Sequence, residues 1–186
     1  MKNILVISGH PDLSQSVANA TILEEVSQQL PSAEIRRLDT LYPNAQFDIT
    51  AEQQALLNAD IIVWQFPFSW YSLPGIMKSW LDQVFLHGFS HGSTAKLAGK
   101  KLLLSFTTGG PQAVYTPEGF FGHSIEEYLI QFETTALLCQ LEYQPPIYTT
   151  GISYATRDDE AKINEQKNLA KAHAEKLITT LRQLAN

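Results

Sequence analysis

The stretch DIIVWQFP, residues 60–67, is the most hydrophobic strand candidate in the chain. Its apolar run is rich in β-branched residues and lacks polar alternation, which is the pattern of a strand buried on both faces of a parallel sheet. Pro67 cannot donate a hydrogen bond to a neighbouring strand, so the strand ends there. The stretch therefore predicts a central strand over residues 60–66.

Short apolar runs and longer segments of helical periodicity alternate on both sides of this stretch. That alternation is typical of a βα succession. Further strands are predicted at residues 4–8, 35–38 and 101–106, and within 141–150, where Pro145 and Pro146 interrupt the strand. Helices are predicted from Ala18 to Leu30, from Thr50, from Pro74 to Gly88, from the cap Ser124 to about 138, and from 158 to about 184.

Five strands with helices between them predict an α/β fold, a three-layer sandwich around a five-stranded parallel sheet. The size of the chain favours the strand order 2-1-3-4-5 of flavodoxin-like domains. The length is 186 residues and no linker or repeat is visible, so we expect one domain over residues 1–186. Ligands of such sheets bind beyond the carboxyl ends of the strands, which draws attention to the loops after strands one, three and four.

Composition narrows the class of protein further. Hydrophobic residues are 44% and charged residues 17% of the chain, which excludes a disordered protein. The formal net charge of −6 argues against nucleic acid as a partner. The single cysteine, Cys139, lies in an apolar stretch and favours a reducing setting. No apolar run is long enough to cross a bilayer, so we expect a soluble, cytoplasmic protein, although docking on a membrane partner is compatible with this composition.

The first loop and the helix after it, residues 8–19, match neither of the common glycine-rich nucleotide motifs. They do place the His10 ring and the Ser16 hydroxyl near a helix N-terminus, where free N–H groups and the helix dipole favour a phosphate. The alternative is that Ser14 or Ser16 only caps the helix and that His10 is a turn residue.

The loop after strand three carries aromatic side chains between two prolines, and the loop after strand four carries two glycines. Trp70 and Tyr71 suit stacking on a flat ligand, whereas Trp64 and Trp80 lie on elements and are assigned to the core. Gly109 and Gly110 allow the backbone to approach a ligand, although such a turn is also ordinary in loops. A phosphate site together with a flat ring site has the shape of FMN.

At this point the sequence resembles the flavodoxin-like NAD(P)H:quinone oxidoreductases, and within them the ancillary quinone reductases of bacterial glutathione-gated potassium efflux systems. The resemblance covers nearly the whole chain and is weakest over 111–124 and after 150. It rests on the order and spacing of short motifs: Gly9-His10-Pro11, Ser16-x-x-Asn19, Tyr42-Pro43, Asp48-Ile49, Ala51-Glu52-Gln53, 59–67, Trp70-Tyr71-Ser72-Leu73-Pro74, Lys78-x-Trp80-Leu81-Asp82-x-Val84, His87-Gly88-Phe89 and Thr107-Thr108-Gly109-Gly110.

The resemblance implies a site for FMN, with FAD as the alternative, and NAD(P)H as co-substrate. It implies ping-pong transfer of a hydride to a quinone, with the chemistry supplied by the flavin. Cofactor contacts carry over to three groups of residues: His10, Ser16, Val17, Ala18 and Asn19 at the phosphate and ribityl end, Pro67, Phe68, Ser69, Trp70 and Tyr71 beside the ring system, and Thr107, Thr108, Gly109 and Gly110 at its edge.

The resemblance also implies a Tyr and a His after the glycine loop that stabilise charge during hydride transfer. Tyr115 matches the Tyr, but the His position falls on Phe121, so His123 is the candidate substitute. A polar residue leading into the next helix is an equal interpretation of His123. His87 and His91 lie in a glycine-containing loop without a further ligand, so we predict no metal site.

The sequence also allows predictions about partners and about competing functions. The aromatic residues at 68–71 and at Phe89, Phe120 and Phe121 would expose much apolar surface in a monomer, so we expect a homodimer. The competing function is that of an FMN-binding regulatory subunit in peripheral contact with a potassium efflux transporter. A flavodoxin-type electron carrier and a receiver domain fit the first loop and the charge less well.

Overall fold

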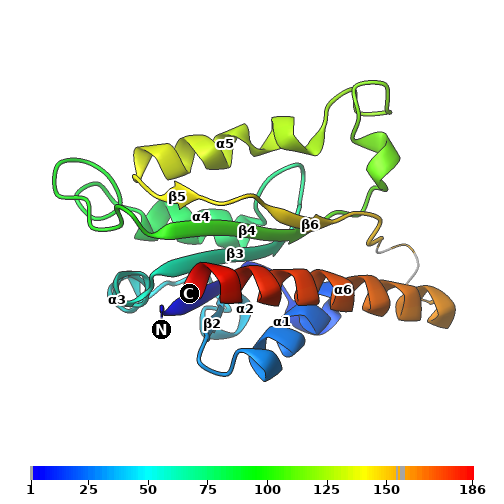
Figure 1. The fold of residues 1–186 in the computed structure, drawn as a ribbon, viewed down its shortest axis with the longest axis horizontal. Coiled ribbons are helices and arrows are strands. Elements are labelled where there is room, and N and C mark those ends of the chain that lie inside the picture. The colour runs from blue at the N-terminus through cyan, green and yellow to red at the C-terminus, as the bar shows by residue number, and fades with distance from the viewer. Residues whose placement is uncertain (1, 154, 156–157) are drawn as a thin grey trace.

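A twisted parallel sheet with helices on both faces forms the protein (Figure 1), whose computed structural model describes residues 2–153, 155 and 158–186. Met1, Tyr154, Thr156 and Arg157, which the predicted domain 1–186 includes, lie outside the described residues. The strands are β1 (Ile4–Ser8), β2 (Glu34–Arg37), β3 (Ile61–Pro67), β4 (Lys101–Thr107), β5 (Glu142–Tyr143) and β6 (Ile147–Thr149). The helices are α1 (Ala18–Gln29), α2 (Leu38–Leu41), α3 (Ile49–Asn58), α4 (Gly75–Val84), α5 (Ile125–Leu138) and α6 (Glu160–Ala185).

The strand order β2-β1-β3-β4-β5 confirms the predicted flavodoxin-like topology. β3 lies between β1 and β4 and is buried along its whole length, as the hydrophobic run at 60–67 predicts. The predicted fifth strand is divided around Pro145 and Pro146 into β5 and β6, and both parts pair in parallel with β4. A proline has no N–H for the ladder, which explains the interruption.

Each face of the sheet has its own hydrophobic core. On one face α1 and α6 pack against alternate strand residues such as Val6, Val63 and Leu103. On the other face α3, α4 and α5 cover the intervening residues, and Trp64 meets Trp80 edge to face at 6.4 Å between ring centroids. Both tryptophans are fully buried and Cys139 is buried too, as expected from the sequence.

Several helix ends differ from the prediction. The helix expected at Thr50 begins at Ile49, because the Asp48 side chain accepts a hydrogen bond from the Ala51 N–H. Pro74 precedes α4 instead of starting it, and α4 ends at Val84, well before Gly88. Ser124 caps α5 as predicted, in a capping box with Glu127. The single turn α2 has no counterpart among the predicted helices.

A buried carboxylate joins the elements on the α3–α4 side. Glu52 is fully buried and accepts hydrogen bonds from Arg36 Nε at 2.8 Å, the Tyr42 hydroxyl at 2.6 Å and Trp80 Nε1 at 2.9 Å. The bonds to Glu52 raise the pKa of Arg36 above its usual value. This cluster links β2 to α3 and α4 and fixes the chain around α2.

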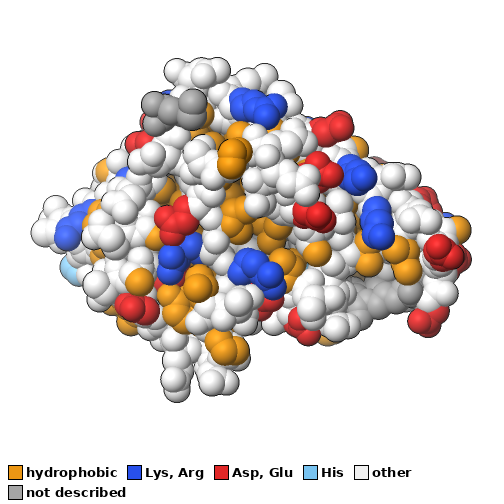
Figure 2. Space-filling model, turned by 90° about the horizontal axis from the view of Figure 1, so that it is seen from below, with side chains coloured by type: hydrophobic (Ala, Val, Ile, Leu, Met, Phe, Trp, Pro, Cys, Tyr) orange, Lys and Arg blue, Asp and Glu red, His pale blue; other side chains and the backbone are white. Residues whose placement is uncertain are grey.

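The face covered by α1 and α6 is seen from outside in Figure 2. Basic and acidic side chains are interspersed across it, and hydrophobic side chains are visible between them. Over the described part of the chain, no helix combines the length and the apolar character that crossing a bilayer requires.

Candidate functional site

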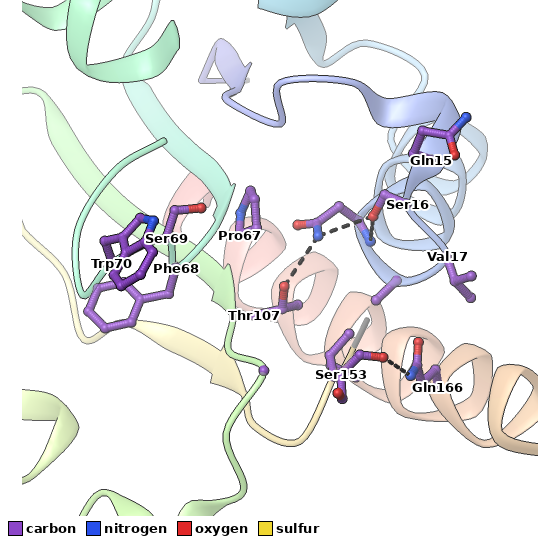
Figure 3. Close-up of a pocket in the computed structure, with 14 residues that line it drawn as sticks. Gln15, Ser16, Val17, Pro67, Phe68, Ser69, Trp70, Thr107, Ser153 and Gln166 are labelled. Atoms are coloured by element: carbon purple, nitrogen blue, oxygen red, sulfur yellow. Dashed lines mark hydrogen bonds between the residues drawn. The ribbon is translucent and has the colours of Figure 1, made fainter. Parts of the chain in front are cut away.

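A cleft of about 260 Å³ opens at the carboxyl ends of β3 and β4, beside the start of α1. Figure 3 shows its two sides: Ser16 and Val17 face the cleft from the α1 side, and Phe68 and Trp70 lie opposite them. Thr107 lies between, and Ser153 and Gln166 close the third side. The lining consists of Gln15, Ser16, Val17, Ala18, Asn19, Pro67, Phe68, Ser69, Trp70, Thr107, Gly109, Ile152, Ser153 and Gln166.

The start of α1 supplies hydrogen-bond donors to the cleft. The Ser16 hydroxyl oxygen accepts from the Asn19 N–H at 3.1 Å and from Asn19 Nδ2 at 3.3 Å, so its own proton can be donated elsewhere. Among the described residues, the N–H groups of Val17 and Ala18 have no protein acceptor. No lysine, arginine or histidine is present in the described lining. This wall therefore offers neutral donors and the positive end of a helix dipole, which suit an anion.

Asn19 ties this wall to the sheet. Its Nδ2 donates to Thr107 Oγ1 at 3.2 Å, and its Oδ1 accepts from Gln65 Nε2 at 2.6 Å. The bonds from Asn19 to Ser16 and Thr107 are drawn in Figure 3. Asn19 and Gln65 are both buried, so losing one partner would leave the other amide unsatisfied. Asn19 thus fixes the distance between α1 and β4 at the floor of the cleft.

A second buried polar group lies below this floor. His173 of α6 is 3% exposed and makes hydrogen bonds with Ser105 Oγ at 2.8 Å and Thr149 Oγ1 at 2.9 Å. Burial lowers the pKa of His173 from 6.5 to about 4, with a smaller contribution from Lys176. The imidazole is therefore neutral at pH 7 and acts as a link between α6 and the sheet.

The opposite wall ends in a tight turn at Ser69–Ser72. The backbone N–H of each serine donates to the carbonyl of the other, at 3.1 and 3.0 Å. The two central residues, Trp70 and Tyr71, have φ of 49° and 63°. A left-handed conformation at residues other than glycine costs about 1–3 kcal/mol each. Trp70 is nevertheless 93% exposed, so burial of its own ring does not offset that cost.

Comparison with known proteins agrees with the observed fold. A family model described as a flavodoxin-like fold matches residues 2–174. The chain belongs to the flavodoxin-like fold family.

Solved structures similar to this flavodoxin-like protein carry different names. General stress protein 14 from Treponema denticola, crystallised in complex with FMN, is 32% identical, with a TM-score of 0.86 and coverage of 96% of this chain and 99% of that one. A thermophilic tryptophan halogenase from Streptomycin violaceusniger is 30% identical, with a TM-score of 0.80 and coverage of 91% and 97%. An NADPH-quinone reductase from P. pentosaceus is 24% identical, with a TM-score of 0.74 and coverage of 94% and 96%, and shows the shared fold alone.

Within the flavodoxin-like fold, most of the residues predicted to bind a cofactor meet at the cleft. Ser16, Val17, Ala18 and Asn19 line it on one side, and Pro67, Phe68, Ser69, Trp70, Thr107 and Gly109 line the rest. The structure does not bring His10, Tyr71, Thr108 and Gly110 to the lining.

Each of these four residues has another role. His10 is buried, and its Nδ1 accepts from the Asp12 N–H at 3.1 Å, so it serves the loop after β1. The Thr108 hydroxyl donates to the Gly110 carbonyl at 2.9 Å, and Gly110 packs so closely that an added Cβ would lie 3.2 Å from the Tyr115 ring. Tyr71 turns its ring to α5, where it stacks on Tyr128 at 5.2 Å.

The two predicted catalytic residues lie outside the lining. Tyr115 is buried beside Gly110, and burial raises the pKa of its phenol. Its ring belongs to an aromatic cluster with Tyr71, Phe121 and Tyr128. His123 is exposed and lies 3.3 Å from Glu127, four residues along the chain. That position fits the interpretation of His123 as a polar residue leading into α5.

Sequence reasoning missed Gln15, Ile152, Ser153 and Gln166. The last three belong to the segment after β6 and to α6, and Gln166 Nε2 donates to the Ser153 carbonyl at 2.9 Å. No motif marks them: Ile152 and Ser153 follow β6, where the Ile152 N–H donates to the Thr108 carbonyl at 2.8 Å, and Gln166 comes with α6, which packs on the same face of the sheet as α1.

The loop at 86–92 is irregular, as its glycines indicate. His87 and His91 pair across it, with ring centroids 5.4 Å apart. Over the residues that the structure describes, no group of three or more His, Cys, Asp or Glu side chains could hold a metal ion. Phe89, expected at an exposed loop, is buried against the core below α4.

Proposed function

We propose that this protein is a flavin-dependent NAD(P)H:quinone oxidoreductase, a single flavin-binding domain over residues 1–186 that holds FMN in the cleft. The observation that carries the proposal is the pairing of neutral donors at the start of α1 with the aromatic wall at Phe68–Trp70 across one cleft. The 32% identical protein was crystallised with FMN, and proteins of the same fold are named quinone reductases. Both findings support the proposal.

The residues present fit the parts of FMN. The free N–H groups of Val17 and Ala18 and the Ser16 proton would bind the phosphate, without a basic side chain among the described lining residues. Phe68 and Trp70 would lie along the ring system, and Thr107 and Gly109 at its edge. Because the cleft offers one anion-binding wall, we favour FMN over FAD.

When bound, the flavin would supply the hydride chemistry. The protein's own contribution is to bind, orient and exclude water. Both substrates would have to reach the flavin beside the same aromatic wall, so the proposal has nicotinamide and quinone binding in turn. Tyr115 stays the proposed donor to developing charge: it does not line the cleft, but its hydroxyl packs beside Gly110, the neighbour of the lining residue Gly109, and it is protonated at neutral pH. His123, which is exposed, is the weaker candidate for proton donation.

The test of the flavin site uses Ser16→Ala with Ser14→Ala as a matched control. Ser14 is two residues away, but its hydroxyl donates to Asp12 Oδ1 at 2.6 Å and does not line the cleft. Ser16→Ala should weaken FMN binding about tenfold, or ~1.4 kcal/mol, the range of a hydrogen bond to a charged group. Ser14→Ala should leave it unchanged. The FMN dissociation constants are measured by quenching of flavin fluorescence. Equal constants for the wild type and the two variants would show that the FMN phosphate does not bind at the start of α1.

The reaction is tested with the FMN-loaded protein, NAD(P)H and a small quinone. Parallel double-reciprocal lines are expected, because the substrates alternate in one cleft. Intersecting double-reciprocal lines would contradict alternate binding of the two substrates in one cleft. Loaded protein that reduces no quinone would favour the regulatory subunit predicted as the alternative. Among the described residues nothing singles out a transporter-binding surface, so contact with a potassium efflux system and the cytoplasmic location stay predictions from the sequence.

A homodimer is part of the proposal. Ile130, Leu137 and Leu138 of α5 are exposed, Leu137 to 79%, and Ile130 and Leu137 lie two turns apart on one side of the helix. Phe120 and Trp70 add further exposed aromatic surface. Sedimentation at micromolar concentration should give twice the chain mass of 20.8 kDa, and Leu137→Glu should shift the protein to monomer. A wild-type monomer would contradict the dimer.

A further inference from the structure

The turn at Ser69–Ser72 requires support from outside its own residues. Turns of two residues with positive φ at both positions usually carry Asn-Gly, because these residues tolerate the left-handed region. Here the positions hold Trp70 and Tyr71, with φ of 49° and 63°. The pair of backbone bonds between Ser69 and Ser72 closes the turn but leaves the unfavourable φ values in place. Some neighbouring element must hold this conformation.

α5 makes the contacts that could do so. The Gln131 side chain bridges the turn: its Oε1 accepts from the Ser72 hydroxyl at 3.1 Å, and its Nε2 donates to the Tyr71 carbonyl at 3.4 Å. The same Nε2 donates to the Tyr128 carbonyl at 3.2 Å, which anchors the amide on its own helix.

The second contact is between rings. Tyr71 stacks on Tyr128, with ring centroids 5.2 Å apart and an angle of 21° between the ring planes. Tyr128 also meets Phe68 at 6.3 Å, edge to face, so it touches the chain on both sides of Ser69 and Trp70. Neither Gln131 nor Tyr128 lines the cleft, whereas Phe68, Ser69 and Trp70 do.

We propose that Gln131 and Tyr128 are positioning residues that keep the Ser69–Ser72 turn in its left-handed form and thereby set the aromatic wall of the cleft. The effect on ligands rests on the proposed function, because FMN is the molecule expected at that wall. The conformation of the turn does not rest on it. In this proposal ring and amide are both required, so that losing either contact releases the turn.

The experiment measures the turn and the ligand separately. The variants are Gln131→Leu, Tyr128→Leu and their combination, with Tyr128→Phe as the conservative variant. Gln28→Leu is the matched control, because Gln28 is an exposed helical glutamine whose amide bonds Glu24 at 3.3 Å, away from the turn. In the apoprotein, ¹⁵N spectra report the Trp70 indole, assigned with Trp70→Phe, and the Tyr71 backbone amide. FMN affinity is then measured on the same proteins.

The expected result is that both leucine variants shift or broaden the Trp70 and Tyr71 signals while the buried Trp64 and Trp80 indoles keep theirs. Their FMN dissociation constants should rise roughly three- to tenfold, the change that corresponds to one lost neutral hydrogen bond. The double variant should be little worse than either single one. Tyr128→Phe and Gln28→Leu should behave as wild type.

Unchanged Trp70 and Tyr71 signals in both leucine variants would overturn the proposal, and so would unchanged FMN affinity in a variant whose turn has moved. Equal changes at Trp64 and Trp80 would show a global effect and also overturn it. Wild-type protein that binds no FMN would refute the proposed function, and the apoprotein spectra would still decide whether α5 holds the turn.

Discussion

Replacing His173 with glutamine should flatten the dependence of stability on pH. The folded pKa of about 4 lies below the usual 6.5, so on acidification the unfolded chain takes up the proton first. The resulting stability is fully present above pH 6.5 and is lost as pH falls towards 4. The shift corresponds to about 3 kcal/mol in full, of which about 2 kcal/mol is lost between pH 7 and pH 5.

Glutamine is the suitable replacement because its amide can donate to one neighbouring hydroxyl and accept from the other, as the neutral imidazole does with Ser105 and Thr149. Urea denaturation at pH 7 and pH 5, followed by circular dichroism, gives the free energy of unfolding of both proteins. The wild type should lose about 2 kcal/mol more than the variant over this interval. Equal losses would show that His173 is not held neutral by burial, since the other histidines contribute equally to both proteins.

Three further changes test other parts of the structure. Glu52→Gln should lower the free energy of unfolding, measured in urea, by about 3 kcal/mol. This is the low end for breaking a buried ion pair, since Arg36 keeps its bond to Glu34. A loss below about 1 kcal/mol would contradict the importance of this cluster. Gly9→Ala would place a Cβ 2.3 Å from Met77 Sδ and should cost about 1–3 kcal/mol of stability. An added Cβ at Gly75 would meet no atom within 4 Å, so Gly75→Ala should be neutral or stabilising. Similar thermal midpoints for the two variants would refute the close approach of Gly9 to Met77. Tyr115→Phe should lower quinone turnover by roughly 10–10³ while FMN stays bound, and full turnover would remove this hydroxyl from the mechanism.

The sheet could be predicted from the sequence because its central strands are decided by local composition. The runs at 4–8, 61–67 and 101–107 are apolar, short and bounded by proline or glycine-containing loops. α2 could not be predicted, because four residues contain little more than one helical turn and show no periodicity. Its position depends on the distant contacts of Glu52 with Arg36 and Trp80.

Some residues of the candidate site could likewise be predicted from the sequence, and others could not. Ser16 and Asn19 belong to the loop and helix after β1, and the 67–70 segment to the end of β3 and the loop after it, so the topology brings them to one edge. Gln166 reaches the cleft from the last helix, and no local signal marks it. The sequence predicts that Gly110 approaches a ligand, yet its close neighbours are the Val114 and Tyr115 side chains, and only Gly109 lines the cleft. Side-chain direction within a loop depends on contacts that the sequence does not display.

The two outer edges of the sheet also govern how this protein can associate. β5 and β6 are only two and three residues long and are separated by Pro145 and Pro146, and β2 at the far edge carries Glu34, Arg36 and Arg37. Short, charged or proline-broken edges give an incoming strand few places to form a ladder. The native molecule is thereby protected against edge-to-edge aggregation at high concentration. Two copies that meet in solution are therefore expected to join through helices and loops rather than by extending the sheet from one chain to the next.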